Sequence, residues 1–142
     1  MTGMGSNSVS AAASATEVLA ALRDGQASEM ATIRRCTGEI QLVSVDRSLA
    51  SAERQATIRN LQRLRSQANQ ALRDLEDIEL RIVAGSQYAR DAVDALTAAA
   101  RRLIAEVSGT REISQHATDL AGAINGVTDA AEVVLSRIAP AQ

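Results

Sequence analysis

Apolar residues recur between positions 61 and 82 with alternating steps of three and four residues. The series is Leu61, Leu64, Ala68, Ala71, Leu75, Ile78 and Ile82. Because an α-helix has 3.6 residues per turn, these steps place all the side chains along one stripe of a helix. The intervening residues are mostly charged or carry amides. The pattern therefore predicts a helix with one apolar seam that faces a partner helix, while its other face meets water.

The same seven-residue frame continues through most of the chain. If Leu61 is position a and Leu64 is position d, thirty-five a and d positions fall between Leu19 and Ile138, and twenty-seven of them are apolar when Ala and Cys are counted. A composition that is 46% apolar would give about sixteen. The excess predicts an all-α chain with coiled-coil-like heptad packing. The larger residues expected at helix-helix interfaces are Leu61, Leu64, Leu75, Ile78, Ile82, Leu96, Leu103, Ile113, Leu120, Ile124, Val127, Val134 and Ile138.

The first helix has a recognisable start and an apparent stop. Ser14 and Glu17 have the spacing of a capping box, in which each side chain satisfies a backbone amide of the first helical turn. Gly25 is placed to end this short helix. Residues 1–13, which precede this helix, are rich in Gly, Ser and Ala and are predicted to be a disordered tail. This leaves 14–139 as a single helical domain.

Two further breaks shape the predicted topology. Gly85 is followed by serine and predicts a turn, and Gly109 predicts a bend or a second turn. The segments 28–83 and 87–138 have nearly equal length, so we predict a long antiparallel helical hairpin that turns near Gly85. A continuous rod is the alternative. Because two helices bury little apolar surface, we expect oligomerisation to complete a helical bundle.

The composition supports an all-helical fold and bears on where in the cell the protein is expected. The chain lacks Phe and Trp, and Tyr88 is its only aromatic residue, so the core must consist of small aliphatic side chains that suit close helix packing. The single proline, Pro140, interrupts no interior segment. Neither a membrane-spanning run nor a signal-peptide pattern is found, which predicts a soluble cytoplasmic protein. The alternative is a small secreted helical-hairpin protein exported without a signal peptide.

The sequence offers little material for catalysis or cofactor binding. His116 is the only histidine, has no metal-ligating neighbour at helical spacing, and is expected to be exposed or to flank the seam. Cys36 is the only cysteine and is expected to be a buried, inert thiol, with an interchain bridge or a redox sensor as alternatives. The acids from Asp74 to Glu79 fan out over a helix instead of converging on a metal. We therefore predict no catalytic residue, no cofactor and no metal.

Arginine supplies all fifteen basic residues of the chain, and a stripe of them precedes the acids of the central helix. Arg59, Arg63 and Arg73 lie at outer heptad positions and form a candidate basic surface. Such a stripe can follow nucleic-acid phosphates. The formal net charge of −2 and the lack of stacking aromatics favour a salt-bridged bundle surface instead.

One stretch resembles a known class of helices. Thr110 to Ile138 is similar to the Ala, Ser and Thr-rich heptads of bacterial chemoreceptor signalling helices, and this resemblance implies a long antiparallel hairpin that dimerises. The hairpin tip of that family has no counterpart around Gly85. The helical-hairpin substrates of type VII secretion share the expected architecture, but the chain has no Trp-x-Gly turn, and Ala92 stands four residues after Tyr88 where an acid would be needed. The chain is assigned to neither family.

Taken together, the pattern favours association as the function. We predict a non-enzymatic structural or adaptor protein of bacterial style that acts through helix-helix, coiled-coil contacts. Its expected partner is another copy, in a dimer or higher homo-oligomer, or a helical protein. Binding of nucleic acid is the less favoured alternative, and no membrane span is expected.

Overall fold

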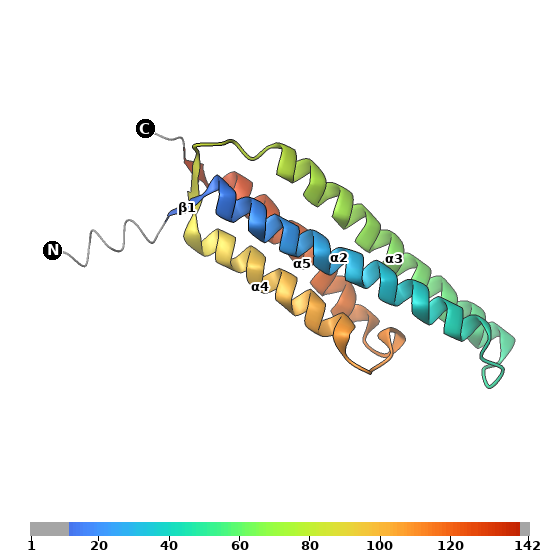
Figure 1. Cartoon of the computed structure of the whole chain (residues 1–142). Coiled ribbons are helices and arrows are strands. Elements are labelled where there is room, and N and C mark those ends of the chain that lie inside the picture. Colours follow the sequence, from blue (N-terminus) through green and yellow to red (C-terminus); the bar gives the residue numbers. More distant parts are fainter. Residues whose placement is uncertain (1–11, 140–142) are drawn as a thin grey trace.

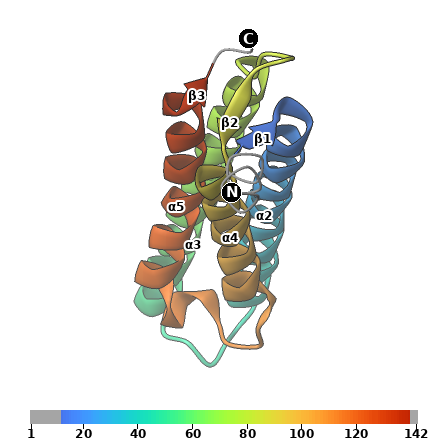
Figure 2. The same ribbon diagram turned by 90° about the vertical axis from the view of Figure 1, so that its left-hand side faces the viewer.

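The computed structural model describes residues 12–139, and within them four helices pack antiparallel into one bundle (Figure 1). The helices are α2 (Ala15–Ser44), α3 (Ser51–Leu80), α4 (Arg90–Ser108) and α5 (Ala117–Ser136), with a short 3₁₀ helix, η1 (Ile113–Gln115), before α5. The helices α2 and α5 occupy opposite corners, and each packs against both α3 and α4 (Figure 2). The all-α prediction is confirmed.

The topology differs from the predicted single hairpin. The chain forms two consecutive hairpins, α2–α3 and α4–α5, and the turn at Gly85 joins them. Gly85 has φ +85°, a left-handed conformation that glycine adopts without steric cost, and it is the only residue with positive φ within the described part of the chain. The second break, after Ser108, reverses the chain instead of merely bending it. As a result four helices close the bundle within one chain, and its core requires no second copy.

Gly25 does not end a helix, contrary to the sequence-based expectation. It lies inside α2, on the side that faces the other three helices. A Cβ atom there would come within 2.9 Å of Val127 Cγ1, 3.5 Å of Leu75 Cδ1 and 3.9 Å of Leu96 Cδ1. Glycine in a helix interior costs about 1 kcal/mol relative to alanine, but it permits this approach. The predicted short N-terminal helix is therefore only the first part of one 30-residue helix.

A small antiparallel sheet closes one end of the bundle. Its strands are β1 (Ala12–Ser14), β2 (Gln87–Ala89) and β3 (Ile138–Ala139), in that order. In the centre Tyr88 pairs with Ala13 and with Ile138, and its buried phenol oxygen accepts a hydrogen bond from the Val83 amide at 3.1 Å. The last two residues of the predicted tail thus belong to a strand, and residues 1–11 lie outside the described residues.

The predicted interface residues mostly face the interior of this single chain. Eleven of the thirteen are buried; Ile82 is half-buried, and Ile138, on β3, is 39% exposed. The heptad positions a and d hold in α3 and α5. In α2 the buried line runs along d and g instead, because this helix packs against both α3 and α4, and Leu19, Ile33 and Ile40 are only half-buried.

Within residues 12–139, none of the helices combines the length and the apolar character that crossing a membrane requires.

Candidate interaction surface

The two hairpins differ in length, so part of the longer hairpin does not pack against the shorter one. Helices α2 and α3 have 30 residues each, whereas α4 has 19 and α5 has 20. About ten extra residues at 1.5 Å per residue make roughly 15 Å of helix. Figure 1 shows α2 and α3 continuing past the ends of α4 and α5. We call residues 40–59, which comprise the end of α2, the connecting loop and the start of α3, the two-helix extension.

A polar network marks where the four-helix bundle ends. The Arg35 guanidinium donates to the carbonyl oxygens of Val107, Gly109 and Arg111 at 2.7, 2.8 and 3.0 Å. Glu39, which forms an ion pair with Arg35 at 2.8 Å, accepts the Ile113 amide at 3.0 Å. These charge-assisted bonds fix the α4–α5 connection, residues 109–116, across the side of α2. We call this connection the shelf.

The structure describes every residue of the extension, and none of them is buried. Its α2 end is nevertheless apolar on several sides, since Ile40, Leu42, Val43 and Val45 fall within six consecutive positions. Leu42 is 69% exposed and Val45 is 75% exposed. The exposed Leu42 and Val45 lie beside the half-buried Ile40 and Val43, so this end carries an apolar surface that nothing in the single chain covers.

The loop at the tip of the extension is held in a defined shape. Arg54 donates to the carbonyl oxygens of Asp46 and Leu49 at 3.2 and 3.1 Å. Asp46 accepts the Ser48 amide at 2.9 Å, and the side-chain and backbone hydrogen bonds from Ser48 lower the pKa of the Asp46 carboxyl. Arg54 occupies an a position of the heptad frame, and these two contacts with the loop account for a charged residue there. A preformed tip loses little entropy on binding.

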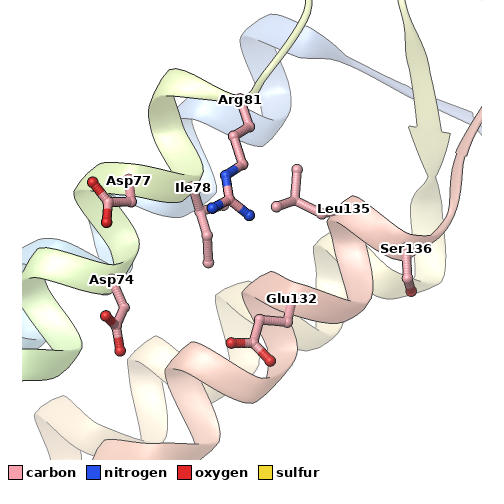
Figure 3. Close-up of a pocket in the computed structure, with 7 residues that line it drawn as sticks. All are labelled: Asp74, Asp77, Ile78, Arg81, Glu132, Leu135 and Ser136. Atoms are coloured by element: carbon pink, nitrogen blue, oxygen red, sulfur yellow. The ribbon is translucent and has the colours of Figure 1, made fainter.

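A groove lies between α3 and α5, in the part of the bundle away from the extension (Figure 3). It has a volume of about 400 Å³ and is lined by Asp74, Asp77, Ile78, Arg81, Glu132, Leu135 and Ser136 (Figure 3). Figure 3 shows the Arg81 side chain reaching from the end of α3 toward Leu135. Among the described residues no group of three His, Cys, Asp or Glu side chains is arranged to hold a metal ion. The groove is open, and its acidic residues alone do not define a ligand.

The arginine stripe is split by its neighbours. Arg59, Arg63 and Arg73 are all exposed on the outer side of α3. Arg73 donates to the Gln70 side chain at 2.9 Å and precedes Asp74 directly, so acids begin where the stripe would continue. Arg59 and Arg63 make no hydrogen bond or ion pair within residues 12–139. Arg59 and Arg63 lie one helical turn apart, whereas the acid-flanked Arg73 lies further along α3. The basic surface is therefore short, which does not favour an extended phosphate contact.

The lone histidine and cysteine occupy structural positions. His116, which was expected to be exposed or to flank the seam, is buried, so exposure is excluded. Its Nδ1 lies 2.9 Å from Glu106 Oε2, which ties the start of α5 to the end of α4. Cys36 is fully buried, as expected. Its burial, and next the charge of Glu39, raise the pKa of the thiol to about 11, so it stays protonated at neutral pH.

The most unusual polar group is Glu29, inside the bundle. This residue has 0% exposure, and neither carboxyl oxygen has a hydrogen-bond partner within the described residues. Burial raises the pKa of its carboxyl from an ordinary 4.5 to about 9. The carboxyl is therefore neutral at pH 7 and is unsuited to binding a cation. Glu29 occupies a d position of the heptad frame and is one of the positions there that are not apolar.

The extension itself could not be recognised from the periodicity, because its half-buried residues follow the same heptad frame as the core. The one available signal was the run of apolar residues at 40–45, which stands outside that frame at Leu42 and Val45. Comparisons with protein-family models, with curated proteins and with solved structures find no match to this chain.

Proposed function

We propose that the protein is a non-enzymatic structural or adaptor protein that acts by helix-helix association through its two-helix extension. The observation that supports this most strongly is the absence of any buried residue at positions 40–59, combined with the apolar end of α2. Exposed apolar clusters of this kind mark contact surfaces in otherwise well-packed proteins.

The proposal differs from the sequence-based one in the surface it uses. Leu75 and Leu120, which were expected to join chains, have 0% exposure inside the bundle. Association through them would require the bundle to open. The extension offers Leu42 and Val45 without any rearrangement, and partners that bind preformed surfaces lose the least conformational entropy.

A paired substitution in the extension tests the proposal. We expect the wild-type chain to associate as its concentration rises, and the variant Leu42→Asp with Val45→Asp to remain a monomer at the same concentrations. Both side chains are largely exposed, so the charges should leave folding intact while making a dry contact unfavourable. Sedimentation velocity reports the assembly state, and circular dichroism reports the fold.

Val133→Asp is the matched control, since Val133 is an apolar residue on α5, 45% exposed and remote from the extension. The control should associate as the wild type does. A wild-type chain that stays monomeric up to millimolar concentration, or a paired variant that associates normally, would exclude the extension as the associating surface.

A further inference from the structure

We infer that the partner of the two-helix extension is the extension of a second copy of this chain, placed antiparallel to the first about a twofold axis. The inference rests on the proposed function and adds the identity of the partner and the geometry of the complex. In this arrangement the extensions overlap, and each tip loop reaches the shelf of the other copy.

The first argument is the number of helices. The bundle contains four helices up to the level of Glu39 and only two beyond it. The missing pair is an antiparallel hairpin about ten residues long on each side, and the extension of a second copy is a hairpin of that kind and length. Two overlapping extensions would therefore continue the four-helix packing from one bundle into the next.

The second argument is the shelf. Its backbone is fixed by the three bonds from Arg35 and by the bond from the Ile113 amide to Glu39. Because these bonds fix its backbone, the shelf forms a surface of defined shape at the end of the four-helix bundle. The tip loop, which Arg54 holds in shape, is a matching rigid element. Two preformed surfaces of this kind suit a specific contact.

The third argument is charge. Residues 40–59 carry three arginines and two acids, so two extensions repel each other only weakly. The exposed charged residues of the shelf are Arg111 and Glu112, and the tip carries Asp46 and the exposed Arg47. Antiparallel overlap brings Arg47 near the second copy's Glu112 and Asp46 near its Arg111. A head-on meeting of tips would instead oppose Arg47 to itself, which is unfavourable.

The first and last described residues do not cover the extension. Strands β1 and β3, which contain the first and last described residues, lie at the opposite end of the bundle from the extension (Figure 1). An antiparallel dimer would therefore leave both sheets at its two outer ends, with the extensions at its centre.

Paired cysteines test the geometry in the full-length chain. We expect the double variant Arg47→Cys with Glu112→Cys to give mostly covalent dimers with a short bis-maleimide linker, because each tip approaches the other shelf. Each single variant should give only background cross-linking, since the two copies of residue 47 lie at opposite ends of an overlap of about 15 Å. The native Cys36 is buried and should not react. The pair Arg47→Cys with Glu76→Cys, which joins the tip to an exposed position remote from the shelf, is the control.

The outcomes separate the inference from the proposed function. Efficient cross-linking of the single Arg47→Cys variant would show tips meeting head-on and would overturn the antiparallel geometry, although the extension would still be the contact surface. A dimer in sedimentation without cross-linking of the 47 and 112 pair would also overturn it. A monomer at all concentrations, without cross-links, would overturn both the inference and the proposed association.

Discussion

Replacing Glu29 with glutamine is expected to stabilise the protein at neutral pH by about 3 kcal/mol and to flatten its stability between pH 5 and 9. The carboxyl is fully buried without a hydrogen-bond partner within the described residues, and its pKa in the folded chain is about 9. Folding at pH 7 must therefore protonate a group that is ionised in the unfolded chain. Glutamine has nearly the same shape and removes that requirement.

The sign of the pH dependence follows from the raised pKa of Glu29. Between pH 4.5 and about 9 the folded chain holds a proton that the unfolded chain has lost. The free energy of unfolding therefore falls as the pH rises through this window, and the contribution of Glu29 is most favourable below pH 4.5. Other titrating groups change the slope of both proteins equally, so the difference between wild type and variant isolates this carboxyl.

Urea unfolding at a series of pH values measures this effect. The wild-type and Glu29→Gln proteins should have similar midpoints near pH 4.5 and diverge steadily above it. Glu76→Gln makes the same chemical change at an exposed position of α3 and should follow the wild type throughout. Parallel pH profiles for the wild type and Glu29→Gln would mean that the carboxyl is solvated or paired in solution.

Introducing a charge at the centre of the core should have the opposite effect. Leu75 has 0% exposure, and its Cδ1 atom would lie 3.5 Å from a Cβ atom at Gly25 of α2. Leu75→Asp removes a buried aliphatic side chain and buries an unpaired carboxylate. We expect a loss of at least about 4 kcal/mol, which is enough to unfold a marginally stable chain. Leu120→Asp, also at 0% exposure, should behave similarly.

Leu80→Asp is the control for the same substitution on the same helix. Leu80 is 85% exposed, so its replacement should change the free energy of unfolding by less than about 0.5 kcal/mol. The comparison uses chemical denaturation followed by far-ultraviolet circular dichroism. Equal midpoints for Leu75→Asp and Leu80→Asp would contradict the interior position of the seam.

Periodicity was sufficient to predict the helices but not their arrangement. The seam of α3 from Leu61 to Ile78 is buried at each predicted a and d position, because the step pattern of a helix directly specifies its apolar face. Which helix covers that face is decided by loops. A turn at Gly85 is compatible with one hairpin or with two, and the alternatives differ only in whether the chain also reverses after Val45 and after Ser108.

Other features depended on contacts that sequence spacing does not contain. Gly25 appeared to be a helix stop, because its packing against Val127 is visible only once four helices are assembled. The strands are two or three residues long and rich in alanine, too short for an alternating pattern. The extension is defined by the ends of α4 and α5, far away in the sequence, so its lack of any buried residue could not be foreseen from the local pattern.

Hydrogen exchange at several protein concentrations tests most directly whether the bundle closes alone while the extension needs a second chain. In dilute solution we expect the backbone amides of 40–59 to exchange at least about tenfold faster than those of 61–78, because a two-helix segment without a buried core opens easily. Raising the concentration should slow exchange at 40–59 and at the shelf, and leave 61–78 unchanged. Exchange at 40–59 that is as slow as in the core in dilute solution, or that does not respond to concentration, would contradict the role of the extension.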